Sequence, residues 1–172
     1  MEYDYEKGLN YALYLLSLQM KTISQMREKL SSKEMSPELV QKIITYLTSL
    51  SYLDDVLYAQ YFIRSRRHKY GDYRIKMELS RKGVSGEDIA LAYHALAEEE
   101  GESVPDQDET VRVVLEKKIA TTNIDWNRLK LDYKYKYATY QKLASFLAGR
   151  GFSSSVVKSA VSERLAENFI DE

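Results

Sequence analysis

Asp54 and Asp55 are the side chains best placed for acid–base chemistry, because they form an adjacent pair directly before the apolar segment "VLYAQYFI". Adjacent residues on a helix point about 100° apart, so the two carboxylates would not converge on one reacting atom. Their position instead predicts a helix start. Ser51 and Asp54 have the spacing of a capping box, which supports this structural interpretation.

His68 and His94 are the only histidines, and their separation matches no metal-binding motif. The chain has no cysteine, which excludes thiolate ligands and cysteine nucleophiles. Its 7 glycines form neither a phosphate-binding loop nor a dinucleotide fingerprint, and no Gly-x-Ser-x-Gly elbow occurs. We therefore expect no catalytic residue, no metal and no cofactor, and interpret the chain as a binding protein rather than an enzyme.

The composition favours a helical fold. Of the 172 residues, 44% are hydrophobic and 30% are charged, which suits a buried core beneath a solvated surface. The 7 Gly and 2 Pro are few turn residues for a many-stranded sheet. The start of the chain is acidic and holds only a short apolar run, whereas a membrane span needs about 20 apolar residues. We expect a cytoplasmic protein, which the absence of cysteine also suits.

Charge is strongly segregated along the chain although the net charge is only -1. Residues 64–82 hold eight basic side chains against two acidic ones, and residues 111–150 hold nine against three. Between them, residues 98–109 hold seven acidic side chains and no basic one. Two basic regions separated by an acidic linker indicate a local surface for a charged partner better than the average charge does.

Three segments of the chain align without gaps. They are "MREKLSSKEMSPELV" from Met26, "IKMELSRKGVSGEDI" from Ile75 and "LASFLAGRGFSSSVV" from Leu143. The apolar residues at a spacing of four predict one face of a helix. The serine that follows each stripe predicts the N-cap of a second helix. The repeated unit is therefore a helical module that occurs three times.

The turn between the two helices carries Gly83 in the second copy and Gly151 in the third, where a helix end often adopts a left-handed conformation. The first copy has Glu34 at the matching position, so we expect its turn to differ. A further segment, "DYKYKYATY" in the third copy, alternates tyrosine with lysine as a strand would. Its tyrosines also fit helical spacing, and we predict a helix because a lone strand would have no partner.

An amphipathic segment precedes each copy, so each unit is expected to contain three helices, of about 40–50 residues, that gain packing from their neighbours. The predicted organisation is as follows: repeat 1 at 1–52, repeat 2 at 53–98, the acidic linker at 99–109 and repeat 3 at 110–172.

The central sequence resembles the signature of RecX proteins. The matching residues run through "YLDDVLYAQYFIRSR" and "YGDYRIKMELSRKGVS". The segment "LASFLAGRGFSSSVV" is similar to the C-terminal Arg-Gly-Phe segment of that family, and "ALYLLSLQMKTISQMREKL" to its N-terminal one. The resemblance spans about residues 10–165 and includes the three-repeat organisation.

The resemblance implies an all-α protein of about nine helices, built from three tandem three-helix repeats in an elongated, curved body. It also implies a monomeric regulator that binds RecA recombinase filaments and inhibits RecA ATPase, strand exchange and co-protease activity in recombination and SOS DNA repair. Some members of the family also bind DNA. The signature positions, which we interpret as structural, are Asp54, Asp55, Gly71, Leu79, Gly83 and Gly151.

The basic residues near position 70 are interleaved with Tyr61, Tyr70 and Tyr73, a combination that suits phosphate contacts and base stacking. We favour a partner surface over a solvated helix face. The residues predicted to contact RecA or DNA are Arg64, Arg66, Arg67, Lys69, Arg74, Lys76, Arg81, Lys82, Lys134, Lys136, Lys142 and Arg150.

Two alternatives stay open at this point. A three-helix unit is also the scaffold of helix-turn-helix readers, so the chain could be a nucleic-acid-binding module that acts directly on single- or double-stranded DNA. It could also be a helical adaptor that binds neither DNA nor RecA.

Overall fold

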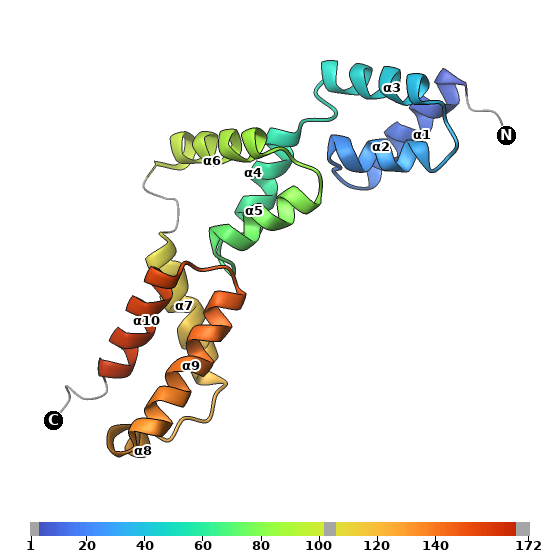
Figure 1. Ribbon diagram of the computed structural model, residues 1–172. Helices are drawn as coiled ribbons and strands as arrows, with labels where there is room; N and C mark the ends of the chain where they lie inside the picture. The colour runs from blue at the N-terminus through green and yellow to red at the C-terminus, as the bar shows by residue number, and fades with distance from the viewer. Residues whose placement is uncertain (1–3, 102–105, 168–172) are drawn as a thin grey trace. The chain divides into compact units, whose positions relative to one another are not determined.

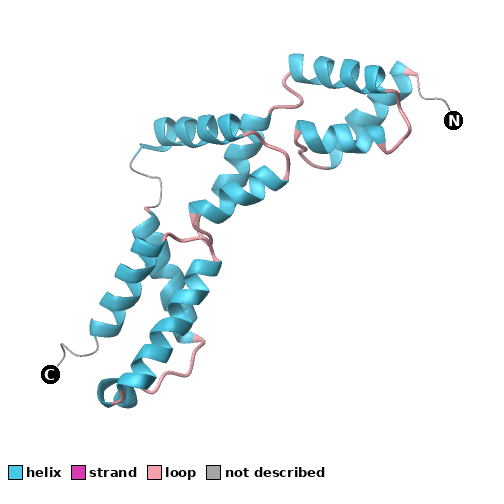
Figure 2. Cartoon of the chain, in the orientation of Figure 1, coloured by secondary structure: helices cyan, strands magenta, loops and turns pink. Residues whose placement is uncertain are grey.

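The chain folds into α-helices joined by short turns, and Figure 2 shows no strand among the residues described, 4–101 and 106–167, in this computed structural model. Figure 1 places the helices in chain order. The ten helices of the described residues are α1 Tyr5–Leu18, α2 Ile23–Ser31, α3 Pro37–Ser49, α4 Asp55–Arg66, α5 Asp72–Arg81, α6 Gly86–Glu100, α7 Gln107–Ala120, α8 Trp126–Leu131, α9 Tyr133–Gly149 and α10 Ser154–Glu167.

The predicted all-α class and the three three-helix repeats are confirmed. The first repeat contains α1 to α3, the second α4 to α6, and the third α7, α9 and α10. The third repeat also contains the short α8, which brings the count to ten rather than about nine. The segment "DYKYKYATY" is helical, as predicted, because it begins α9 and buries Thr139 on the side that faces the core.

Contacts divide the chain into two compact units that do not coincide with the repeats. The first unit is Met1–Ile63 with Met77–Gly101, and the second is Arg64–Lys76 with Glu102–Glu172. The second repeat therefore contributes to both units. The predicted repeat boundaries stay predictions, and residues 102–105 of the proposed acidic linker lie outside the described residues. The predicted elongated, curved shape also stays a prediction.

Each repeated stripe is buried. In the first unit α1, α2 and α3 pack together around the first stripe, and in the second unit α7, α9 and α10 pack side by side around the third (Figure 1). Burying a leucine or isoleucine side chain contributes about 1.5–3 kcal/mol, so the stripes supply much of the folding free energy. The buried stripe residues are Met26, Leu30, Met35, Val40 and Ile44; Ile75, Leu79, Val84 and Ile89; and Leu143, Leu147, Phe152, Val157 and Val161.

The three predicted serine caps are present. Ser36 accepts a hydrogen bond from the backbone N–H of Leu39 at 3.3 Å. Ser85 accepts one from the N–H three residues ahead at 3.0 Å, and Ser153 does the same at 3.4 Å. Each bond satisfies one of the free N–H groups at a helix start, so the sequence pattern has the same local consequence in all three repeats.

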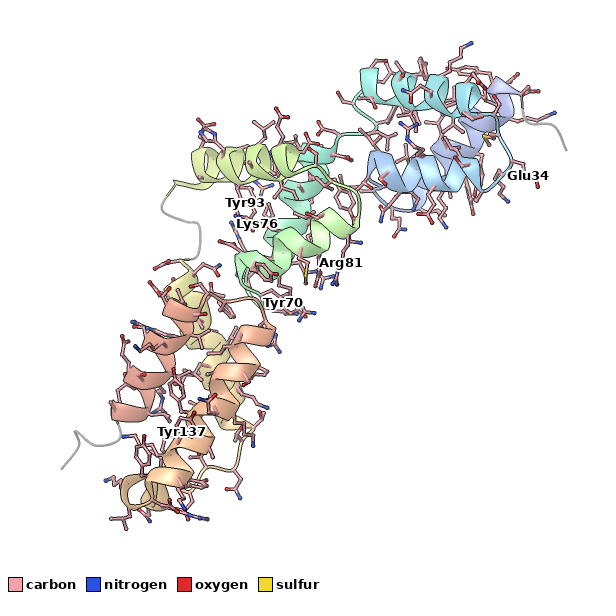
Figure 3. All side chains as sticks on the ribbon, viewed as in Figure 1. Glu34, Tyr70, Lys76, Arg81, Tyr93 and Tyr137 are labelled. Atoms are coloured by element: carbon pink, nitrogen blue, oxygen red, sulfur yellow. The ribbon has the colours of Figure 1, made fainter. Side chains whose placement is uncertain are left out.

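Glu34 adopts the left-handed backbone conformation that was expected only of glycine. Its φ is 59°, close to 84° at Gly83 and 85° at Gly151. The expectation that the first turn differs is therefore wrong, since the connection between helices requires the same chain reversal in each repeat. Glu34 is exposed in the turn between α2 and α3 (Figure 3), so its side chain gives no packing to offset the steric cost of its Cβ atom.

No helix in the described part of the chain has both the length and the apolar composition needed to span a bilayer.

Replacing Glu34 with glycine should stabilise the chain by about 0.5–1 kcal/mol, because glycine adopts a left-handed conformation without the cost of a Cβ atom. The midpoint of urea unfolding measures this change. Glu34→Ala is the matched control, since it removes the carboxylate but keeps the Cβ atom, and we expect no comparable gain. Equal stabilisation by both substitutions would show that the backbone conformation of residue 34 is not the cause.

Candidate partner-binding surface and the junctions between repeats

Asp54 lies at the start of α4, where it caps the helix as its position in the sequence predicts. Its carboxylate accepts a hydrogen bond from the backbone N–H of Leu57 at 2.9 Å. The predicted capping box from Ser51 is wrong, because Ser51 lies in the turn after α3 with a φ of 57°. The N–H of Ser51 donates to the carbonyl of Thr48, which closes that turn before the new helix begins.

Asp55 is buried and links two repeats within the first unit. Its carboxylate accepts a 2.8 Å hydrogen bond from the backbone N–H of Ile23, at the start of α2. A carboxylate is favourable there because the N-terminus of a helix carries partial positive charge. Burial raises the pKa of Asp55, as do the charges of Asp88 and Asp54, whereas the hydrogen bond from Ile23 acts in the opposite direction.

The first and second repeats also meet where two turns touch. The hydroxyl of Thr22, which caps α2, donates to the carbonyl of Lys82 at 2.7 Å. A side chain on the next residue, Gly83, would overlap with Ser24. Gly83 therefore has two reasons to be glycine: its left-handed backbone and the close approach of the preceding repeat.

The second and third repeats meet in the same way, within the second unit. The N–H of Gly71 donates to the carbonyl of Arg150 at 2.9 Å. A Cβ atom on Gly71 would overlap with the backbone of Gly151, and one on Gly151 would overlap with Arg74. In the alignment of the repeats, Gly71 occupies the position of Thr22, and Arg150 that of Lys82. Equivalent carbonyls thus accept the junction hydrogen bond in both places.

Three of the predicted contact arginines surround Tyr70, in the turn between α4 and α5 (Figure 3). The guanidinium carbons of Arg74, Arg150 and Arg66 lie 4.3, 5.5 and 5.9 Å from the centre of its ring. Arg74 also donates to the carbonyl of Gly149 at 3.2 Å, and Arg150 to that of Lys69 at 3.2 Å. Their predicted contact with a partner stays a prediction, but these arginines have an internal role at the junction.

The other predicted contact residues differ in exposure. Arg64, Arg67, Lys82 and Lys136 are half-buried, and the amine of Lys82 lies 5.6 Å from the ring centre of Phe62. The remaining residues have exposed side chains that a partner can reach, including Lys76 and Arg81 on α5 (Figure 3). The exposed members are Lys69, Lys76, Arg81, Lys134 and Lys142.

Sequence reasoning missed two groups of residues. Lys117 and Lys118 line a cleft with Lys69 and Arg150, although the sequence indicates them only as part of the amphipathic segment before the third copy. The second group is an apolar tip at the join of α8 and α9, where the exposed fractions are 90% for Leu131, 80% for Tyr133 and 56% for Tyr137. Lysine–tyrosine alternation was the available signal for this tip.

The described residues contain no group of three or more His, Asp or Glu side chains placed to hold a metal ion. His94 lies 3.5 Å from Glu98 on the exposed surface of α6, and His68 lines the same cleft as Lys117.

The raised pKa of Asp55 predicts a pH-dependent difference from Asp55→Asn. A carboxyl whose folded-state pKa lies above the ordinary 3.8 binds its proton more tightly in the folded state. The stabilisation that the protonated Asp55 provides is therefore complete below pH 3.8. It is lost as the pH rises through the raised pKa of Asp55. The stability of the natural chain relative to Asp55→Asn should therefore fall as the pH rises above 3.8, measured by urea unfolding.

Asp125→Asn is the control for this experiment, because it removes one carboxylate from the start of another helix, α8, and keeps a capping oxygen. If the natural chain instead gains stability relative to Asp55→Asn as the pH rises, burial does not raise the pKa of Asp55 and this explanation is wrong.

Two family models of known proteins match the first and the second repeat of this chain separately. The family model described as RecX, first three-helix domain, matches residues 9–47, and that described as RecX, second three-helix domain, matches residues 54–92. Among solved structures, the crystal structure of RecX from Lactobacillus salivarius has a TM-score of 0.69 and 28% identity, and the match covers 95% of this chain and 97% of that one.

Curated relatives carry the name Regulatory protein RecX. The relative from Leuconostoc mesenteroides is 30% identical over 166 residues, which is 94% of this chain but 56% of the relative. The chain thus spans little more than half the length of that protein. The relative from Clostridium perfringens strain 13 is 32% identical over 167 residues, covering 97% of this chain and 72% of the relative. With two matched domains and this identity along nearly its whole length, the chain belongs to the RecX family.

Proposed function

We propose that this chain is a monomeric, cytoplasmic and non-enzymatic regulator that binds RecA filaments on DNA. It inhibits RecA ATPase, strand exchange and co-protease activity in recombination and SOS DNA repair. Membership of the RecX family supports a regulatory role, since the curated relatives are named as regulatory proteins. The RecX signature in the sequence supports RecA as the partner.

The observation that carries the proposal is the set of exposed basic side chains outside the junctions. Lys134 and Lys142 lie on α9, about two turns apart, and both are exposed. A filament of protein on DNA presents phosphate and acidic side chains, and a complementary basic surface accelerates association and fixes its orientation. These residues can contact a partner without loss of an internal interaction that the fold uses, unlike Arg74 and Arg150.

The apolar tip of Leu131, Tyr133 and Tyr137 adds a second kind of contact beside Lys134 in the sequence, and Figure 3 shows Tyr137 at this end of the third repeat. Exposed tyrosines beside cations are typical of protein interfaces, where an aromatic side chain contributes a large buried area. The same chemistry also stacks on bases of single-stranded nucleic acid. This tip is the specific feature that favours the alternative of a nucleic-acid-binding module acting directly on DNA.

The double substitution Lys134→Glu, Lys142→Glu should raise the concentration needed for half-inhibition of the DNA-dependent ATPase of RecA by about tenfold, or about 1.4 kcal/mol. The reason is the loss of two favourable charge contacts on α9. We choose these residues over Arg64 and Arg67, which are half-buried, because reversing a half-buried charge would also disturb packing. Lys29→Glu, Lys158→Glu is the matched control with the same change of charge on exposed sites of α2 and α10.

Four outcomes would contradict parts of the proposal. No inhibition by the natural chain at stoichiometric excess over RecA would exclude the inhibitory function. Unchanged potency of the α9 variant would remove that helix from the interface. Tight, strongly salt-dependent binding of single-stranded DNA without RecA, lost in Tyr133→Ala together with inhibition, would favour the DNA-binding module. Binding of neither DNA nor RecA would leave a helical adaptor.

A further inference from the structure

A cleft of about 340 Å³ lies within the second unit, where α7 and α9 meet the turn between α4 and α5. This volume is at the lower end of clefts that hold small molecules, about 300–1,000 Å³. The described residues that line it are His68, Lys69, Val114, Lys117, Lys118, Thr121, Phe146 and Arg150.

One face of α7 forms one wall of the cleft. Val114, Lys117, Lys118 and Thr121 follow the spacing i, i+3, i+4 and i+7, which places them on the same side of the helix. Val114 is buried in the core of the third repeat and fixes this face against the rest of the unit. The hydroxyl of Thr121 donates to the carbonyl of Lys118 at 3.0 Å, so its proton is not available to a ligand.

The ring of Phe146 on α9 holds two of the cations in position. The guanidinium carbon of Arg150 lies 4.6 Å from the centre of the Phe146 ring, and the amine of Lys118 lies 5.0 Å from it. Arg150 also donates to the carbonyl of Lys69 at 3.2 Å. Phe146 packs against the core, so the ring brings cations from α7 and α9 together on a fixed support. Less ordering is then needed when an anion binds.

Neutralisation of helix ends does not account for this much positive charge. Lys117 and Lys118 are in the last turn of α7, and Arg150 is the C-cap of α9, where cations compensate the helix dipole. A helix C-terminus carries roughly −0.5 of an elementary charge, so two helix ends contribute about −1. The four cations of the cleft leave an excess of roughly +3 over that, and none of its described lining residues is acidic.

We propose that this cleft binds a phosphate group. Lys117 and Lys118 would contact it from α7, Arg150 from the end of α9, and Lys69 from the turn between α4 and α5. Ammonium groups attract phosphate as point charges, and a guanidinium offers directed hydrogen bonds to its oxygens. The phosphate belongs either to a small molecule such as a nucleotide or to the backbone of a nucleic-acid strand. Neither Lys134 nor Lys142 is among the described residues that line the cleft, and phosphate binding there does not depend on RecA.

The test uses the full ¹⁵N-labelled chain at fixed ionic strength, titrated separately with three probes. These are inorganic phosphate, adenosine 5′-monophosphate and an oligothymidylate without terminal phosphates. We expect saturable shifts of the backbone amide signals of Lys117, Lys118, Thr121 and Arg150. Lys117→Gln, Lys118→Gln should weaken binding at least tenfold. Lys29→Gln, Lys158→Gln is the matched control and should bind as the natural chain does.

The probes also identify the source of the phosphate. Saturation by inorganic phosphate and the nucleotide assigns the cleft to a small molecule, whereas saturation by the oligothymidylate alone assigns it to a strand backbone. The absence of saturable shifts with all three probes would overturn the proposal, as would equal affinity in the Lys117→Gln, Lys118→Gln variant. Either result would leave the inhibition of RecA untouched, because that function is measured with a different partner and with substitutions at Lys134 and Lys142.

Discussion

The fold depends on a close approach between the backbones of neighbouring repeats. At each junction, a carbonyl at the end of one helix accepts a hydrogen bond from the turn before the second helix of the preceding repeat. The carbonyl belongs to Lys82 at the first junction and to Arg150 at the second. Such an approach leaves no room for a side chain on Gly83, Gly71 or Gly151.

This constraint also explains why the segment around Tyr70 is so basic. A helix ends on either side of each junction, and the helix ends leave partial negative charge that arginine and lysine compensate. Arg74 and Arg150 also stabilise the second junction directly, because they donate hydrogen bonds to carbonyls across it and pack against the Tyr70 ring. Part of the positive charge therefore stabilises the fold, and the exposed lysines of α9 are the better candidates for partner contact.

The repeat, the serine caps and the left-handed glycines could be predicted because each depends on residues close together in the sequence. Ser36 lies three residues from the N–H that it caps, and the stripe from Met26 has the period of a helix. The prediction for Glu34 was wrong because the sequence shows which residue types favour a left-handed conformation. It does not show which backbone conformation the connection between the two helices requires.

Contacts between distant residues could not be predicted from the same patterns. The hydrogen bond between Asp55 and Ile23 spans 32 residues, and that between Arg150 and Lys69 spans 81. In the sequence Lys117 and Lys118 resemble ordinary helix-surface residues, and only the fold brings them into one cleft with Phe146 and Arg150. A cleft of this kind results from the packing of helices. The sequence shows which residues are basic, but it does not show which of them lie close together.

The most direct test of the junction is the free energy of unfolding of Gly71→Ala, measured in urea beside Gly86→Ala. The φ of Gly71 lies outside the left-handed range, so this substitution tests the close approach alone. Gly86 starts α6 and has open space around it. The junction predicts a loss of about 1–3 kcal/mol for Gly71→Ala from overpacking, and no loss for Gly86→Ala. Equal free energies of unfolding for Gly71→Ala and Gly86→Ala would contradict the close backbone approach at Gly71.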